Sequence, residues 1–243
     1  MLNFNQILLS NSCKQVLLGA LLGDGSLRVQ KNYKNARFQM RHSIIQKTYF
    51  DWKVSQLNEI AITKAVALQG PDGFSTNKKL HFQSRALESL TTLYKITHHK
   101  NKLMIRRKWL NLMNPLALMV WWFDDGSLIS GRRQGVICTD SFDINSVKIL
   151  SRYLKVVWGI ETRVRLKSKK IPDQYRLFLN TSETIKFLKI ILPCIPKKEM
   201  LPKVLISYKD DNIQQRWISE IQKNVSFEIT CSDIEQILES IRK

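Results

Sequence analysis

Residues 16–27 read VLLGALLGDGSL, and residues 118–128 read LMVWWFDDGSL. Each stretch is an apolar run that ends in Asp-Gly-Ser-Leu, and the two aspartates are Asp24 and Asp125. A repeat with this long a period predicts a duplicated domain and not a stack of short repeats. We expect each run to form a buried helix that ends at the Asp-Gly pair, where glycine tolerates the helix-terminating conformation.

The residues after each motif repeat one order of patterns: two alternating stretches, an amphipathic stretch, two more alternating stretches and a final amphipathic stretch. In the first half they predict strands 26–30, 36–42, 65–69 and 80–85 and helices 46–59 and 86–95. In the second half they predict strands 127–131, 135–140, 161–167 and 174–180 and helices 144–158 and 183–191. With motif helices over 16–24 and 116–125, the fold class is α+β, with two pseudo-symmetric αββαββα halves that each carry a four-stranded antiparallel sheet.

This pattern also predicts the domain organisation. We expect an N-terminal half over 1–100, a linker over 101–113, a C-terminal half over 114–209 and a helical extension over 210–243. The extension has no counterpart in the first half.

The composition bounds the class of protein. The chain has 243 residues, of which 44% are hydrophobic, so it can bury a core and a disordered tail is excluded as the main interpretation. The longest apolar runs fall well short of the roughly 20 residues that span a bilayer. The first residues, MLNFNQILLSNSCK, lack a basic leader before an apolar stretch, so we expect no secretion signal. Four scattered cysteines predict reduced thiols in an intracellular protein.

The charge points to a polyanionic partner. Lys and Arg number 39 and Asp and Glu number 20, which gives a formal net charge of +19. A membrane surface would call for a basic amphipathic helix or a polybasic block, whereas these charges are spread along the whole chain. We therefore expect nucleic acid as the partner and no membrane.

The predicted strands separate charged from apolar side chains. Arg37, Gln39 and Arg41 alternate with Phe38 and Met40, so one set faces the core and the other faces outward. An ordinary solvated sheet face usually mixes both signs of charge, but acidic residues are nearly absent here. We predict that the outward polar set and the cations near it contact DNA: Arg28, Gln30, Arg37, Gln39, Arg41, Lys79, His81, Gln83, Arg85, Arg132, Arg133, Arg163, Arg165, Lys167 and Arg176.

The two motif acids predict a shared metal site. Gly19 and Gly23 lie on one face of the first helix and permit a close approach of backbones, so packing the motif helices side by side brings Asp24 and Asp125 together. Two neighbouring carboxylates repel each other unless a cation lies between them. Oxygen ligands suit Mg²⁺, with Mn²⁺ as a substitute, and such a site can hydrolyse a phosphodiester. The alternative for each acid is an ordinary turn residue before glycine.

The paired motifs resemble the signatures of LAGLIDADG homing endonucleases, of the single-chain, two-motif, intron-encoded kind, over about residues 14–206. The resemblance implies that Asp24 and Asp125 bind the metal and that Gly23 and Asp124 contribute backbone carbonyls. It further implies that Lys102 and Lys203 assist the reaction. His42 and Asp140 would be the polar residues that organise water. In the second motif Val120, Trp121 and Trp122 replace the family's small residues at the helix interface.

The same resemblance implies a monomer whose two sheets form a saddle over a long asymmetric duplex and which cuts both strands. Two alternatives stay open: an RNA maturase that assists splicing of its host group I intron, and a regulator that only binds. Richness in Lys, Asn and Ile is typical of AT-rich genomes, so we expect an organelle or the bacterial cytoplasm as the location.

Overall fold

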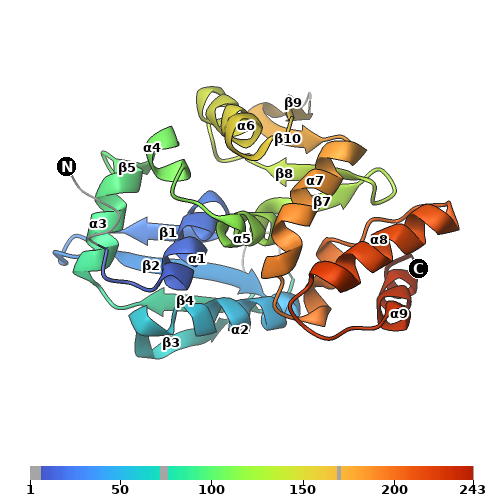
Figure 1. The fold of residues 1–243 in the computed structure, drawn as a ribbon. Coiled ribbons are helices and arrows are strands. Elements are labelled where there is room, and N and C mark those ends of the chain that lie inside the picture. The colour runs from blue at the N-terminus through green and yellow to red at the C-terminus, as the bar shows by residue number, and fades with distance from the viewer. Residues whose placement is uncertain (1–6, 72–75, 169–170, 243) are drawn as a thin grey trace. The chain divides into compact units, whose positions relative to one another are not determined.

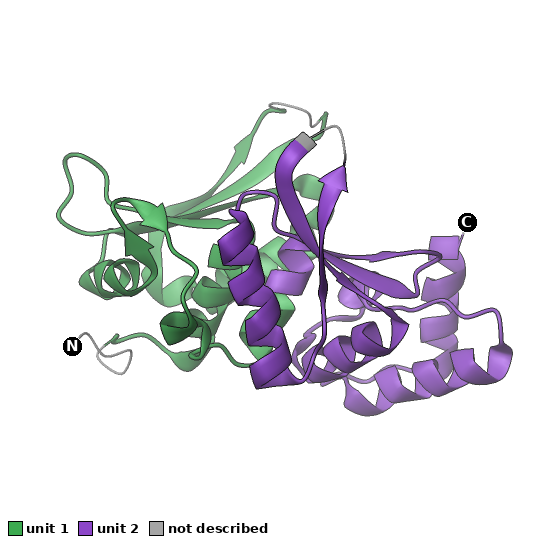
Figure 2. Ribbon diagram, turned by 90° about the horizontal axis from the view of Figure 1, so that it is seen from above, with its two compact units in different colours: residues 1–120 green, residues 121–243 purple. Residues whose placement is uncertain are grey.

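The computed structural model describes residues 7–71, 76–168 and 171–242 (Figure 1). The chain divides into two compact units, residues 1–120 and residues 121–243 (Figure 2). The boundary lies inside helix α5 (Pro115–Asp125), later than the expected linker over 101–113. The reason is that the first residues of α5 pack against the first motif helix and so belong to unit 1.

Unit 1 has the predicted αββαββα order. Its elements are α1 (Asn11–Leu22), β1 (Gly25–Arg28), β2 (Arg37–Ser43), α2 (Lys47–Gln56), β3 (Ala61–Gln69), β4 (Lys79–Ser84) and α3 (Glu88–Thr97). The four strands form an antiparallel sheet in the order β1-β2-β4-β3. Shorter elements complete the unit: η2 (Ile44–Gln46), η3 (Asn58–Ile60), β5 (His98–His99), β6 (Lys102–Leu103) and α4 (Arg107–Leu110).

Unit 2 repeats this order from α5. Its further elements are β7 (Gly126–Ile129), β8 (Gln134–Cys138), α6 (Ile144–Trp158), β9 (Arg163–Ser168), β10 (Ile171–Leu179) and α7 (Thr181–Ile191). The strand order β7-β8-β10-β9 is that of the first sheet, so the predicted fold class is confirmed. After α7 come η4 (Leu192–Cys194) and η5 (Lys198–Lys203), and residues 210–243 contain α8 (Asp211–Asn224) and α9 (Cys231–Arg242).

The sheet of unit 1 has the predicted two faces. Phe38, Met40 and Phe82 are buried on one face, where Met40 lies opposite Phe82. On the other face Arg41 lies opposite His81. Because the side-chain period of a strand is two, this register places every polar residue of the alternating set on the face away from the core.

Helix ends explain where prediction and structure agree. Helix α6 covers the predicted 144–158 because the carboxylate of Asp143 accepts from two backbone N–H groups at its start and Gly159 adopts a left-handed conformation at its end. Helix α1 begins at Asn11, earlier than predicted, because the Ser10 hydroxyl accepts from the Cys13 N–H.

The glycines of the two Asp-Gly pairs have a different role from the one expected. Neither Gly25 nor Gly126 has a positive φ; in the described residues only Gly131 and Gly159 among the glycines do. A Cβ at Gly25 would lie 2.7 Å from a ring carbon of Phe38, and one at Gly126 would lie 2.4 Å from ring carbons of Trp122. The prediction of a helix-terminating conformation was wrong. Glycine is needed at these two positions because an aromatic ring occupies the space of a Cβ, and not because of the backbone angle.

Helix α1 and the start of α5 lie in direct contact within unit 1. A Cβ at Gly19 would lie 2.4 Å from the Ala117 carbonyl oxygen and 2.7 Å from the Val120 Cβ. Nearer the helix starts, the Gln15 side chain donates to the Leu112 carbonyl at 2.9 Å. It also accepts from the Asn114 N–H at 2.8 Å. Gln15 contacts residues 112 and 114, and the later Gly19 contacts the later residues 117 and 120. The two helices therefore run parallel.

The sequence also led to expectations about membrane-spanning segments and about the cysteines. Within the described ranges, no helix combines the length and the apolar character that crossing a membrane requires. All four cysteines are free.

We predict that Gly19→Ala lowers the free energy of unfolding by about 1–3 kcal/mol, because the new methyl group meets the backbone of α5. Urea unfolding measures this change. Gly70→Ala is the matched control, since a Cβ at Gly70 meets nothing within 4 Å. Equal stability of the two variants would show that α1 and α5 are not packed this tightly.

Candidate active site

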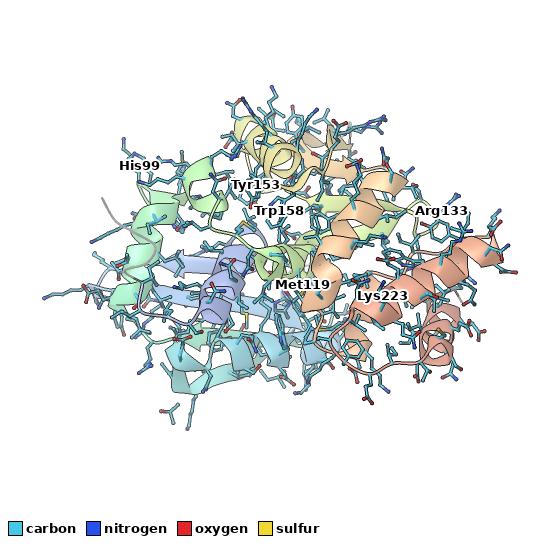
Figure 3. All side chains as sticks on the ribbon, in the orientation of Figure 1. His99, Met119, Arg133, Tyr153, Trp158 and Lys223 are labelled. Carbon is cyan, nitrogen blue, oxygen red and sulfur yellow. The ribbon has the colours of Figure 1, made fainter. Side chains whose placement is uncertain are left out.

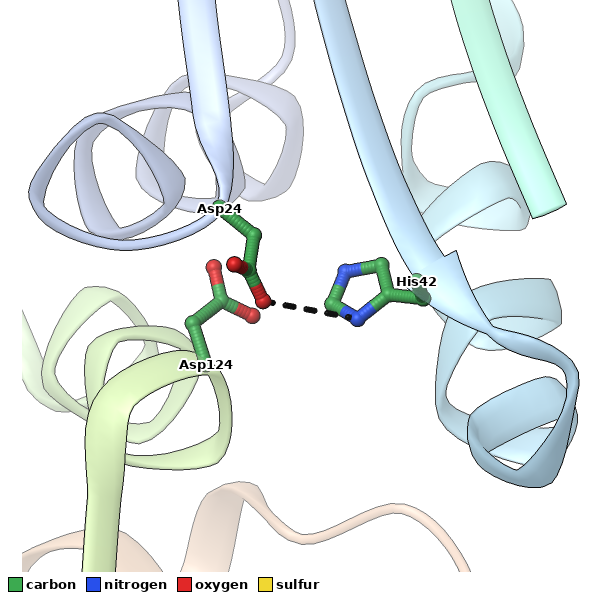
Figure 4. Close-up of side chains that lie close together, drawn as sticks. All are labelled: Asp24, His42 and Asp124. Atoms are coloured by element: carbon green, nitrogen blue, oxygen red, sulfur yellow. Dashed lines mark ion pairs between the residues drawn. The ribbon is translucent and has the colours of Figure 1, made fainter. Parts of the chain in front are cut away.

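The first motif acid lies at the turn between α1 and β1. Asp24 is accessible, with 39% of its side chain exposed, whereas the backbone N–H of Gly23 before it donates to the Ala20 carbonyl. Its carboxylate faces the edge of the His42 ring, with 3.6 Å between Asp24 Oδ2 and His42 Nδ1 (Figure 4). The fold therefore brings the motif acid and the end of the second strand together within unit 1.

His42 is held on several sides. It shares the buried face of β2 with Phe38 and Met40, and only 3% of the residue is exposed. Its Nδ1 lies 3.2 Å from Gln46 Oε1, and Tyr49 packs edge-on against its ring at 5.3 Å between centroids. The ring is thus fixed in orientation toward Asp24.

The second motif acid lies at the end of α5 in unit 2. Asp125 is half-buried, as is Asp124, which Figure 4 also draws. Lys203 donates from Nζ to the Gly126 carbonyl at 2.7 Å, and the Lys203 carbonyl accepts from the Trp122 indole at 3.0 Å. The structure therefore places Lys203 next to the second motif.

Lys102 has a different setting from Lys203. It is exposed on the short β5–β6 ribbon, opposite His99. Lys102 and Lys203 thus have matching positions in the sequence repeat but different surroundings in the structure.

Asp140 is clamped by two cations in unit 2. Arg176 donates to both of its carboxylate oxygens at 2.7 Å, and Lys167 Nζ lies 2.8 Å from Oδ2. The hydrogen bonds from Arg176, followed by those from Lys167, hold the pKa of Asp140 below its usual value despite partial burial. The same hydrogen bonds raise the pKa of Arg176, to which the negative charge of Asp125 also contributes.

Burial and nearby carboxylates act together on the Cys138 thiol, which lies beside this group. Burial raises its pKa most, Asp125 and Asp140 raise it further, and Arg176 lowers it. Asp125, Cys138, Asp140 and Arg176 therefore form one electrostatic cluster in unit 2.

The outer face of the first sheet is cationic. Arg28 lies opposite Arg37, and Gln39 lies opposite Gln83, so residues of three adjacent strands share this face. Burial lowers the pKa of His81, and the neighbouring Arg41 lowers it further. The predicted DNA-contacting residues that lie on these strands are Arg28, Arg37, Gln39, Arg41, Lys79, His81 and Gln83. Gln30 and Arg85 lie just outside the strands, and Arg85 donates to the Glu59 carbonyl at 2.6 Å.

The predicted residues of unit 2 divide into two groups. Arg163 and Arg165 are exposed on β9, and the Arg165 guanidinium lies 5.9 Å from the centroid of the Phe178 ring. Arg133, labelled in Figure 3, is exposed in the β7–β8 turn. Arg176 and Lys167, by contrast, are engaged with Asp140 as described above.

Arg132 differs from the expectation. Its guanidinium donates to the Leu205 carbonyl at 3.1 Å and to the Pro202 carbonyl, and burial lowers its pKa. This arginine therefore ties the β7–β8 turn to the segment after η5 and is not presented to a ligand. Sequence alone gave no signal for these carbonyl partners.

Two αββαββα units, each with an acid at the end of its motif helix and a basic sheet face, define a class of duplicated nucleic-acid-binding scaffold. The chain belongs to the LAGLIDADG DNA endonuclease family, whose model matches residues 14–187. The resemblance drawn from the two motifs is confirmed.

Three relatives are similar in sequence. Protein RecA of Mycobacterium gastri is 31% identical over 76% of this chain, which spans 45% of that protein's length. DNA endonuclease I-ChuI of Chlamydomonas applanata is 24% identical over 76% of this chain and 91% of its own. Cytochrome b mRNA maturase bI2 of Debaryomyces hansenii is 22% identical over 80% of this chain and 74% of its own.

The chain is similar in fold to solved structures. One of them is the homing endonuclease I-WcaI bound to its DNA recognition sequence, with a TM-score of 0.73 and 20% sequence identity over 82% of this chain and 88% of that chain. At this identity the likeness establishes the fold alone.

We predict that Asp140→Asn lowers the free energy of unfolding at pH 7 by about 1 kcal/mol, because the Arg176 and Lys167 hydrogen bonds lose their charged acceptor. The pKa of Asp140 is depressed by folding, so its contribution is present above the usual carboxyl pKa of about 3.9 and is lost as pH falls through the lower folded value.

Urea unfolding between pH 7 and about pH 3 tests this dependence. The difference between Asp140→Asn and the native chain should shrink at the acid end. Asp173→Asn is the control because Asp173 is exposed and Asn also tolerates its positive φ. A difference that is constant with pH, or equal in the control, would contradict the clamp.

Proposed function

We propose that this chain is a site-specific homing endonuclease that hydrolyses both strands of a long asymmetric DNA duplex in a divalent-metal-dependent reaction. The observation that carries the proposal is the position of each motif acid at the end of its helix, where the first strand of a basic sheet begins. Family membership supports the same activity.

The contact of α1 with the start of α5 supports a site that both acids share. Gly19 lies five residues before Asp24, and Val120, which it approaches, lies five residues before Asp125. The two helices run parallel in unit 1, and α5 continues without interruption to Asp125. The spacing along the chain from this contact to the motif acid is therefore the same in the two motifs.

The donor set suits a hard cation. Carboxylate oxygens of Asp24 and Asp125, with backbone carbonyls of Gly23 and Asp124, would hold Mg²⁺ or Mn²⁺. When bound, such ions supply an activated water and neutralise the leaving oxygen of a phosphodiester. His42 orients the Asp24 carboxylate, and the Lys203 ammonium holds the backbone at the second motif.

The net charge of +19 supplies affinity for the DNA backbone, so binding should weaken as salt increases. Contacts with base edges would come from the outer sheet faces, where Arg41, Arg163 and Arg165 are exposed. We propose a monomer, since one chain carries both motifs. An organelle or the bacterial cytoplasm stays our proposal for its location.

The second candidate is an RNA maturase that assists splicing of a host intron. The similarity to the cytochrome b mRNA maturase favours it, and a basic sheet face can serve either polymer. The activity of the purified chain on DNA and on intron RNA separates the two functions.

We predict that Asp24→Asn and Asp125→Asn each abolish cleavage in Mg²⁺ while leaving DNA affinity largely intact, because each removes a metal ligand and no basic contact. A target can be obtained by selecting bound duplexes from a randomised library, or from the joined sequence that flanks the gene's insertion point. Cleavage is followed with each strand separately labelled, with and without EDTA.

Asp51→Asn is the matched control, since Asp51 is exposed on α2 and pairs with Lys47. It should cut like the native chain. Full cleavage by both motif variants would refute the shared metal site. Binding without cleavage by the native chain, together with faster splicing of its intron RNA, would replace the endonuclease by the maturase.

A further inference from the structure

Lys53 is a fully buried lysine on α2. Its side chain has no exposed surface, and it is among the largest fully buried side chains of the described residues. Lysine is almost never fully buried unless it is paired, because removing an ammonium group from water is costly. Its Nζ lies 3.2 Å from Nε2 of His42 and 5.1 Å from the centroid of the Tyr49 ring.

The pairing with Lys53 bears on the hydrogen atoms of the His42 ring. A lysine ammonium has three donors and no acceptor, so toward an ammonium at Lys53 the Nε2 of His42 acts as acceptor. A neutral imidazole that accepts at Nε2 carries its hydrogen on Nδ1. This nitrogen faces two acceptors, Gln46 Oε1 at 3.2 Å and Asp24 Oδ2 at 3.6 Å. The partners on both sides of the ring therefore agree on one tautomer.

We infer that Lys53 is a positioning residue for the catalytic acid of the first motif. It fixes the ring of His42 as the Nδ1–H tautomer, so that the protonated ring nitrogen is the one that lies 3.6 Å from Asp24 Oδ2. This inference rests on the proposed endonuclease function. Outer partners of this kind orient the groups that bind a metal, and their loss typically costs about 10- to 100-fold in affinity or activity.

The alternative role of Lys53 is to fill space in unit 1. Tyr49, Phe50 and Trp52 on the same helix are also buried, and an apolar side chain could replace a lysine stem among them. A purely packing role predicts that loss of the ammonium changes stability and activity together. A positioning role predicts that the cleavage rate falls by more than the loss of stability explains, since removing the ammonium also leaves the buried Nε2 of His42 without this partner.

The first test uses the native chain without DNA. The ring nitrogens of protein labelled with ¹⁵N-histidine report the tautomer directly, and His42→Gln identifies which signals belong to His42. We expect a protonated Nδ1 and an unprotonated Nε2. A protonated Nε2 in the native chain overturns the inference, whatever its variants do.

The second test is Lys53→Met, which keeps the length of the side chain and removes its charge. We expect the His42 signals to move toward the other tautomer and the single-turnover cleavage rate in Mg²⁺ to fall by about 10- to 100-fold. DNA affinity should be unchanged, and the fall in rate should exceed what any lowering of the urea midpoint accounts for. Lys47→Met on the same helix is the control, because the Lys47 side chain is 61% exposed and its Nζ lies 2.5 Å from Oδ2 of the exposed Asp51.

The outcomes distinguish this inference from the proposed function. Failure of the native chain to cut DNA would end the endonuclease proposal and leave the tautomer measurement intact. Native cleavage with no change of tautomer or rate in Lys53→Met would end the positioning role alone. A rate that falls only in proportion to lost stability would assign Lys53 to packing.

Discussion

The structure depends on a helix contact that leaves no room for a side chain. At Gly19 the backbone of α1 meets the backbone of α5, and any Cβ there would overlap the Ala117 carbonyl. Strand β1 follows α1 directly, so the position of the helix also fixes where the first sheet begins. From this contact the chain runs five residues to the motif acid in each motif, from Gly19 to Asp24 and from Val120 to Asp125.

The two units place different chemistry on the same framework. In unit 1 the residue at the end of the second strand is His42, a buried ring with a buried lysine behind it. In unit 2 the strand register places the buried Thr139 at that position, and Asp140, one residue later, is a carboxylate held by Arg176 and Lys167 nearer to solvent. Duplication has preserved the backbone order and the motif acid, whereas the groups that surround each acid have diverged. Each motif acid therefore has different chemistry beside it.

Periodicity and helix signals were enough to predict most of the fold. Helix α6 had its predicted bounds because Asp143 and Gly159 act locally, within a turn of each helix end. The role of Arg132 was out of reach, since its carbonyl partners lie some seventy residues away along the chain. Lys53 was missed although a signal existed: it follows Tyr49 by one helical turn and so falls on the buried face of α2. A lysine on an apolar stripe is the sequence pattern that identifies such a residue.

The most direct measurement is the anomalous diffraction of Mn²⁺ in crystals of this chain bound to duplex DNA. The account predicts manganese within ligand distance of a carboxylate oxygen of Asp24 and of Asp125, beside the phosphodiesters to be cut. Manganese bound by one acid alone, or the two carboxylates on separate faces of the complex, would contradict a site built from both motifs.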